Sequence, residues 1–159
     1  MALEIERKYL VRLDAWRPPA SGGTIHRQGY LSVDSARVVR VRQAGRHAWL
    51  TIKGQNRGIA RTEFEYPIPV ADAKVMLETL CLSPVIEKTR YRVRFGGRVW
   101  EVDVFAGANA GLVVAEVELE SETAEVNRPP WAGPEVSDDP RYYNANLVRH
   151  PFTEWRGDR

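Results

Sequence analysis

The sequence predicts a mainly β fold of the α+β class, a closed eight-stranded antiparallel β-barrel with a few covering helices that include a C-terminal helix. Three observations predict it. Eight short segments alternate polar and apolar residues, turn residues separate most of them, and only two segments have the signals of a helix. A chain of 159 residues is long enough to bury one core, so residues 1–159 are expected to form a single domain.

The predicted strands follow one another closely along the chain. They span residues 3–11, 24–32, 37–43, 47–53, 61–68, 87–95, 98–105 and 112–120. Turn sequences such as AGRH and GQNRG separate them, and the Gly96-Gly97 pair is a two-residue hairpin signal. Sequential strands with such short connections pair antiparallel, as meanders or closed barrels.

Two segments are predicted to be helices. Apolar residues in 70–82 recur at helical intervals, and Pro84 is expected to stop that helix. The C-terminal helix is expected over 140–148, because Asp139 before Pro140 is an N-cap followed by proline in the first turn. Residues 127–139 contain proline and glycine and are expected to form an irregular connection.

Composition excludes several classes of protein. The chain has 23 basic and 21 acidic side chains, so its net charge of +2 gives no indication of a nucleic-acid partner. No apolar run is long enough to span a bilayer, and the first residues lack the pattern of a secretory signal. The lone Cys81 excludes an internal disulfide. We expect a cytoplasmic protein that binds neither membrane nor nucleic acid.

Charge is segregated by face and by strand. Residues two apart in a strand share a face, so Glu4, Glu6 and Lys8 lie together, opposite Ile5 and Tyr9. Most of the other predicted strands repeat this arrangement, with charged faces that carry Arg40 and Arg42; Lys53; Arg61, Glu63 and Glu65; Lys88, Arg90 and Arg92; Glu101 and Asp103; and Glu116, Glu118 and Glu120.

Two interpretations of these faces stay open at this point. An ordinary antiparallel sheet turns a polar face to water and an apolar face to a core. However, like charges two apart on one face repel unless a ligand neutralises them, which divalent cations do for carboxylates and phosphates do for Arg and Lys. Because a desolvated ion costs several kcal/mol, the charges must point outward or line a water-filled lumen. Inward charges would leave apolar outer faces, which the helices and a homodimer would bury.

The order of the charged motifs resembles that of a known family. Glu4-Ile5-Glu6-Arg7-Lys8 is similar to the ExExK signature of the CYTH superfamily, the triphosphate tunnel metalloenzymes. The resemblance continues over nearly the whole chain, through Arg40-Val41-Arg42, Thr51-Ile52-Lys53-Gly54, Arg61-Thr62-Glu63-Phe64-Glu65, Glu87-Lys88-Thr89-Arg90-Tyr91, Glu101-Val102-Asp103, Glu116-Val117-Glu118-Leu119-Glu120 and the segment EVSDDPRYYN at 135–144.

The resemblance implies an eight-stranded tunnel in which bases hold a triphosphate and acids hold divalent metal. The implied phosphate-binding residues are Lys8, Arg40, Arg42, Lys53, Lys88 and Arg90. Tyr30 would either donate a hydrogen bond to substrate or pack at the end of its strand. The implied metal ligands, direct or through water, are Glu4, Glu6, Glu63, Glu65, Asp103, Glu116 and Glu118. Glu101, Glu120, Arg61 and Arg92 share these faces, and for them we expect a structural role.

Residue chemistry favours Mg²⁺ or Mn²⁺ as the cofactor. Both prefer carboxylate, water and phosphate oxygens, and His26, His47 and His150 lack the spacing of a zinc site. Glu63 or Glu118 would position the attacking water, while Lys88 and Arg90 would stabilise charge on the transferred group. The C-terminal residues Arg141, Tyr142 and Asn144 would close one mouth of the tunnel or dock for packing alone.

The short chain and its EVSDDPRYYN segment are most similar to bacterial inorganic triphosphatases, which implies hydrolysis of inorganic triphosphate to pyrophosphate and phosphate. Other triphosphates stay open as substrates: thiamine triphosphate, for which Trp49, Trp100 and Tyr30 are aromatic candidates; nucleoside triphosphates; and ATP in a class IV-type adenylate cyclase reaction. A non-catalytic binder of polyphosphate or nucleotides would keep the bases but tolerate loss of the carboxylates.

Overall fold

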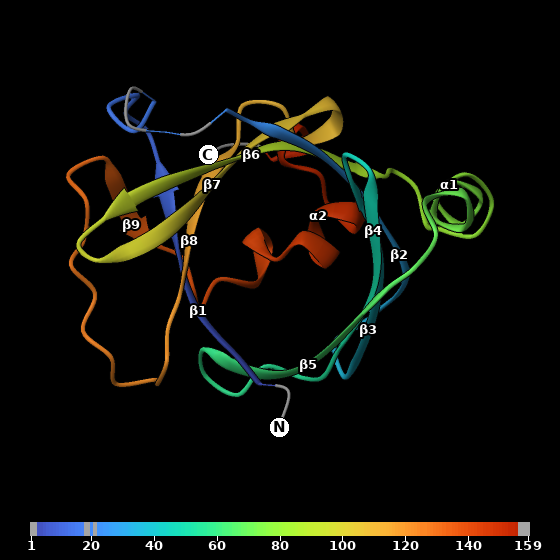
Figure 1. Cartoon of the computed structure of the whole chain (residues 1–159), viewed down its shortest axis with the longest axis horizontal. Coiled ribbons are helices and arrows are strands. Elements are labelled where there is room, and N and C mark those ends of the chain that lie inside the picture. Colours follow the sequence, from blue (N-terminus) through green and yellow to red (C-terminus); the bar gives the residue numbers. More distant parts are fainter. Residues whose placement is uncertain (1–2, 18–19, 21, 156–159) are drawn as a thin grey trace.

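Eight antiparallel strands close into a ring in a computed structural model, which describes residues 3–17, 20 and 22–155. Around the ring each strand pairs with its neighbours in the order β1-β5-β4-β3-β2-β6-β7-β8, and β8 returns to β1 (Figure 1). The strands are β1 (Leu3–Val11), β2 (Thr24–Asp34), β3 (Arg37–Ala44), β4 (His47–Lys53), β5 (Ala60–Pro67), β6 (Ile86–Phe95), β7 (Arg98–Ala106) and β8 (Val113–Glu118). The predicted closed antiparallel fold is confirmed.

Closure depends on the short β1–β5 pairing, in which Glu4 lies opposite Arg61. Elsewhere, tight two-residue hairpins hold β2 and β3, β3 and β4, and β6 and β7 in register. Gly96 and Gly97 have positive φ values of 61° and 77°, the conformation that a two-residue hairpin turn needs, and they align Phe95 with Arg98. The hairpin predicted from this glycine pair is therefore present.

Register decides which way the charged faces point. Glu6 lies opposite Glu118, and Glu101 lies opposite Glu116, so charged residues on neighbouring strands share the inner face of the ring. The alternate residues point outward and form an apolar cluster around Trp100 and Val117, which are at most 1% exposed. The sequence left two orientations open for the charged faces. The structure shows the one in which they line a lumen.

The outer apolar faces are covered by different parts of the chain. On β1, β6, β7 and β8 the cover comes from Trp16 and Trp131, which stand in the connections that follow β1 and β8. On β3 the cover is helix α1 (Val70–Thr79), whose Ala73 and Leu77 pack against Val41. The outer faces of β4 and β5 still expose large apolar residues, namely Ile52, Phe64 and Tyr66. A homodimer that covers them stays a prediction.

The C-terminal segment docks against one end of the ring, within its outline in Figure 1. The predicted helix over 140–148 is wrong in its continuity: a 3₁₀ turn (Pro140–Tyr142) and a short helix α2 (Asn144–Arg149) are separated by Tyr143, whose backbone is extended. Leu147 and Val148 of α2 pack with Tyr142 in the core, where they contact the ring through Tyr30 and Phe105. Packing on the ring therefore decides where the helix breaks.

Other elements also differ from expectation. Helix α1 ends at Thr79, before Pro84. Beyond the helix, the Leu82 N–H donates a hydrogen bond to the Tyr30 carbonyl of β2. A further strand, β9 (Ala132–Glu135), pairs with the outer end of β1 inside the expected connection, where Gly133 and Pro134 conceal any alternation. Strand β8 ends at Glu118, two residues earlier than predicted.

Short 3₁₀ turns occupy Gly107–Asn109 and Phe152–Glu154. No helix in the described part of the chain has the length and apolar character to cross a bilayer.

Candidate active site

The ring encloses a cavity of about 470 Å³ with a strongly charged wall. Acidic and basic side chains line it in equal number: Glu4, Glu6, Glu63, Glu65, Glu101, Glu116 and Glu118, with Lys8, Arg40, Arg42, Lys53, Arg61, Lys88 and Arg90. The end of this cavity near α2 is lined by Tyr143 and Asn144. A surface of this composition suits a polyanion that brings its own cations.

A second cavity, of about 370 Å³, adjoins the first at the other end of the ring. The two share Arg42, Glu65, Arg90 and Glu101 as lining residues, and the second adds His26, His47, Trp49 and Arg92 among others. The guanidinium of Arg42 lies over the Trp49 ring, 4.9 Å from its centroid. Burial, assisted by the charge of Arg90, lowers the pKa of His26 to about 3, so this imidazole is neutral at pH 7.

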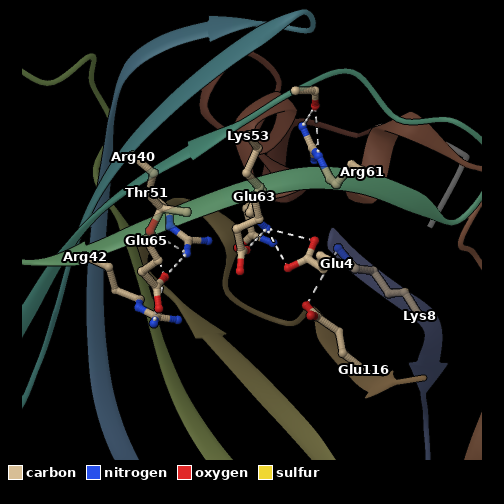
Figure 2. Close-up of polar contacts among 12 residues, drawn as sticks. Glu4, Lys8, Arg40, Arg42, Thr51, Lys53, Arg61, Glu63, Glu65 and Glu116 are labelled. Atoms are coloured by element: carbon tan, nitrogen blue, oxygen red, sulfur yellow. Dashed lines mark hydrogen bonds and ion pairs between the residues drawn. The ribbon is translucent and has the colours of Figure 1, made fainter. Parts of the chain in front are cut away.

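Two arginines on β3 converge on one carboxylate (Figure 2). Arg40 Nη2 and Arg42 Nη2 each lie 3.4 Å from Glu65 Oε2, and the buried Thr51 hydroxyl donates to the same oxygen over 2.8 Å. Within the described residues, the buried Nε atoms of both arginines have no hydrogen-bond partner. Burial and the charge of Arg40 lower the pKa of Arg42. Both arginines line the larger cavity, so their guanidinium groups can bind an anion there.

Lys53 lies between two carboxylates. Its Nζ is 3.1 Å from both carboxylate oxygens of Glu4 and 3.3 Å from Glu63 Oε2, and Figure 2 shows the three side chains meeting inside the ring. Burial, a hydrogen bond with Glu4 and the charge of Glu4 together raise the pKa of Glu63 to about 7. The two carboxyl groups therefore share a proton near neutral pH.

A second carboxyl pair joins β1 to β8. Burial, followed by the charges of Glu116 and Glu4, raises the pKa of Glu6 well above its usual range. The pKa of Glu116 falls well below its usual value: burial raises it, but nearby cations, Lys8 first, and a hydrogen bond with Glu6 outweigh burial. Lys8 Nζ lies 3.8 Å from Glu116 Oε1 and donates to the Tyr142 carbonyl. Glu118, beside this pair, also has a raised pKa because of burial and the charge of Glu4.

Strands β6 and β7 contribute a largely buried ion cluster. The carboxylate of Asp103 is 2.8 Å from Lys88 Nζ and receives two hydrogen bonds from Arg90, of 2.7 Å and 2.9 Å. Asp103 is 0% exposed, and it lines neither cavity. Burial lowers the pKa of Lys88 to about 8, although the charge of Asp103 opposes this.

The carboxylates fit a divalent metal by their chemistry. Glu4, Glu6, Glu63, Glu116 and Glu118 form an all-oxygen donor set of the kind that Mg²⁺ and Mn²⁺ prefer. The pairs Glu4–Glu63 and Glu6–Glu116 each hold a shared proton, which reduces the repulsion between their carboxylates. A bound cation would reduce the same repulsion. Over residues 3–17, 20 and 22–155, no three potential ligands are already grouped as a metal site. Metal binding at these pairs therefore requires the shared protons to leave.

The structure brings nearly all of the predicted site residues into one cavity. Every residue proposed for phosphate, metal or catalysis lines the larger cavity, Tyr30 included, except Asp103. Of the four residues with an expected structural role, Glu101 and Arg61 line this cavity and Arg92 lines the second, whereas Glu120 lies outside and pairs with Arg98. Trp100 is fully buried on the outer face of the ring. The prediction that it could contact the thiamine group of a substrate is therefore wrong.

Two residues of the inner face were not predicted to take part in the site. Gln28 is fully buried and donates both to the Tyr30 hydroxyl, over 3.2 Å, and to Asn144 Oδ1, over 3.0 Å. Thr51 is equally buried between Arg40 and Glu65. Gln28 lies two positions before Tyr30, and Thr51 two positions before Lys53, so each shares a strand face with a predicted site residue. Strand periodicity was therefore the signal that could have identified them.

Fold and site together define a closed antiparallel tunnel with a charged interior. The CYTH domain profile matches residues 2–146. An inorganic triphosphatase of Acetivibrio thermocellus is 49% identical over 98% of this chain and 99% of its own length. An inorganic triphosphatase of Nitrosomonas europaea is 40% identical over 91% of this chain and 96% of its own. A crystal structure described as an inorganic triphosphatase matches with a TM-score of 0.64 at 37% identity, over 93% of this chain and 95% of that one. The chain belongs to the CYTH domain family.

Proposed function

We propose that the protein hydrolyses inorganic triphosphate to pyrophosphate and phosphate, with a divalent metal, Mg²⁺ or Mn²⁺. The observation that carries this proposal is the larger cavity, in which bases and carboxylates face one another across a closed ring. The inorganic triphosphatases with 49% and 40% identity support the choice of substrate. Metal dependence is supported by the carboxylate donor set.

In this proposal the bases bind and orient the triphosphate. Arg40 and Arg42 supply donors from β3, and Lys8 and Lys53 add point charges from β1 and β4. Lys88 and Arg90 hold the transferred phosphoryl group and stabilise the charge that develops on it. The Tyr30 hydroxyl, which accepts from Gln28, is free to donate its own proton to a phosphate oxygen.

The carboxylates hold the metal and handle the attacking water. Glu4, Glu6, Glu116 and Glu118 would hold the cation, which supplies neutralisation of phosphate charge when bound. Glu63, whose pKa is about 7, can accept a proton from water near neutral pH. Because the water must lose a proton and the carboxyl pairs must release theirs, we expect activity to be highest at alkaline pH.

The decisive experiment measures phosphate release by the purified protein from inorganic triphosphate, thiamine triphosphate and ATP in parallel. Each is assayed with Mg²⁺, with Mn²⁺ and with chelator. Metal-dependent release from triphosphate in preference to the other two is expected. Preferential ATP turnover or cyclic AMP formation would instead assign the nucleotide branch of the family, and absence of any release would favour a binder.

A variant separates an enzyme from a binder. Glu4→Gln combined with Glu6→Gln removes two carboxylates and leaves the basic side chains of the cavity in place. An enzyme should lose metal-dependent turnover while metal-free triphosphate binding persists.

The proposal also includes a cytoplasmic location and the lack of a membrane or nucleic-acid partner. A salt-dependent affinity for RNA would contradict it.

A further inference from the structure

We infer that Asp103 is a positioning residue that aligns Lys88 and Arg90 for phosphate, and that it is not a metal ligand. This inference rests on the proposed function and changes the role that the family resemblance implies for Asp103. It is carried by the hydrogen bonds around the Asp103 carboxylate, by the burial of that carboxylate, and by the contrast with its neighbour Glu101.

Both oxygens of Asp103 are already bonded. Oδ1 lies 2.7 Å from Arg90 Nε, and Oδ2 lies 2.9 Å from Arg90 Nη2 and 2.8 Å from Lys88 Nζ. The carboxylate has no exposed surface and does not line either cavity. A metal ligand at this position would have to give up a bidentate guanidinium contact, which is among the strongest hydrogen-bonded pairs in proteins.

The same contacts leave useful donors facing the cavity. Asp103 occupies the Nε edge of Arg90, so Nη1 stays on the cavity side, where Glu101 Oε2 is its partner at 3.3 Å. The Lys88 ammonium has three protons, of which one points to Asp103 and one to Asn144. A third proton remains for a phosphate oxygen. Asp103 thus fixes the direction in which each cation presents its remaining donors.

Without Asp103 the two cations would not stay in place. Lys88 and Arg90 are neighbours on one face of β6, and both are largely buried, with side chains 2% and 12% exposed. Two like charges in such a site repel each other and move toward water unless a counter-charge lies between them. Asp103, directly opposite Arg90 on β7, is that counter-charge.

Glu101 shows what a residue open to a metal looks like on the same strand. It shares the inner face of β7 with Asp103, but its side chain is 33% exposed and lines both cavities. It also lies opposite Glu116 in register, beside the carboxylate group of β1 and β8. Glu101 is therefore the matched control: the same charge and strand, with access to the lumen.

The test measures triphosphate binding by calorimetry in the presence of chelator, where no metal contributes. Asp103→Asn makes the site more positive, so a purely electrostatic effect would tighten binding of the anion. A positioning role predicts the opposite sign, a loss of affinity of about 10-fold to 100-fold, because oriented charge-assisted hydrogen bonds are lost. Glu101→Gln, with the same change of charge, should bind triphosphate as tightly as the wild type or more tightly.

Mn²⁺ binding without triphosphate, followed by electron paramagnetic resonance, gives the second readout. Asp103→Asn should keep the wild-type Mn²⁺ affinity, whereas Glu4→Gln combined with Glu6→Gln, at two proposed metal ligands, should weaken it. The inference is overturned if Asp103→Asn binds metal-free triphosphate with unchanged or higher affinity. This includes the case in which the number of sites per chain falls but the affinity of each site does not. It is also overturned if Asp103→Asn lowers Mn²⁺ affinity by about 10-fold or more.

Failure of the proposed function has a different signature: the wild type would release no phosphate from triphosphate with either metal, whereas the inference is judged by binding in chelator. If Asp103→Asn does not fold, wild-type crystals with Mn²⁺ and a nitrogen-bridged triphosphate analogue decide the matter. Asp103 should keep its contacts to Lys88 and Arg90. An anomalous Mn²⁺ peak at a bonding distance of about 2.2 Å from Asp103 would contradict the inference.

Discussion

Asn144 Oδ1 lies 3.2 Å from Lys88 Nζ and so connects the C-terminal helix to the charged cavity. The same oxygen accepts a hydrogen bond from Gln28 Nε2 over 3.0 Å. Asn144 is the first residue of α2, and the neighbouring Leu147 anchors that helix in the core. Through this one amide, residues more than fifty positions apart in the sequence set the orientation of a buried ammonium group.

Substitutions of Asn144 should therefore change substrate binding. Asn144→Ala leaves Lys88 and Gln28 without an acceptor, and we expect KM for triphosphate to rise about 3-fold to 10-fold, as a single hydrogen bond of about 1 kcal/mol allows. Asn144→Asp should raise KM further, because a carboxylate binds the Lys88 ammonium and repels the substrate. Steady-state kinetics of both variants provide the measurement. Equal KM values for all three proteins would contradict this role.

Arg40 should contribute strongly to triphosphate affinity. Its side chain is largely buried at the cavity wall, and its Nε has no partner within the described residues. We expect Arg40→Ala to weaken binding by about 10-fold to 100-fold, the range for a charge-assisted contact to phosphate.

The matched control for Arg40 lies on the same strand. Arg37 is 75% exposed, pairs with Asp34 in the turn, and lines neither cavity. Arg37→Ala should bind triphosphate as the wild type does. Titration calorimetry with chelator measures both variants, and equal losses in the two would show that only net charge matters.

Most of the fold followed from strand periodicity. The inner face of each strand was predictable because alternation is local, and Glu4, Glu6 and Lys8 need no information from elsewhere in the chain to share a side. Strand β9 was not predictable in this way. It is stabilised by its pairing with the end of β1, so its AGPE sequence carries no signal of its own.

The site was predictable as a set of residues but not as a network. Sequence alternation placed Glu101 and Asp103 on one face equally, and only three-dimensional register separates them, because Arg90 lies opposite Asp103 and binds it. The break at Tyr143 is a similar case. Local signals favoured one helix over 140–148, whereas packing of Tyr142 and Leu147 on the ring requires two short pieces.

Helix α2 should be energetically important despite its length of 6 residues. Leu147 is 0% exposed and packs among side chains from the ring and from the C-terminal segment. We expect Leu147→Ala to lower the free energy of unfolding by about 2–5 kcal/mol, the usual cost of truncating a buried leucine. Val75→Ala, at a position 57% exposed on α1, should change it little. Urea denaturation compares the two, and a small loss for Leu147→Ala would mean that α2 is only loosely docked.

The carboxyl pair of Glu63 and Glu4 should make the metal-free protein less stable as pH rises. Burial and the nearby Glu4 raise the pKa of Glu63 to about 7 in the folded state, while the unfolded chain has the ordinary value near 4.5. Between these values the folded state binds more protons than the unfolded state, so the free energy of unfolding falls with increasing pH. This loss begins near the unfolded pKa and is complete above the folded one. Glu6, with its own raised pKa, acts in the same direction.

Thermal unfolding in chelator between about pH 5 and pH 8 measures this linkage as the difference between the wild type and Glu63→Gln, because the lowered pKa of His26 acts in the opposite direction in both proteins. Glu63→Gln removes one of the two titrating groups, so its midpoint should decline less with pH than that of the wild type, while Glu6 maintains part of the decline. Glu78→Gln, on the exposed side of α1, serves as the control and should follow the wild-type slope. Added Mg²⁺ should oppose the decline, since a cation replaces the protons that the carboxyl pairs release. Equal slopes for Glu63→Gln and the wild type would show that Glu63 ionises without cost in the folded protein, and would exclude the shared proton as the feature that prepares this site for metal.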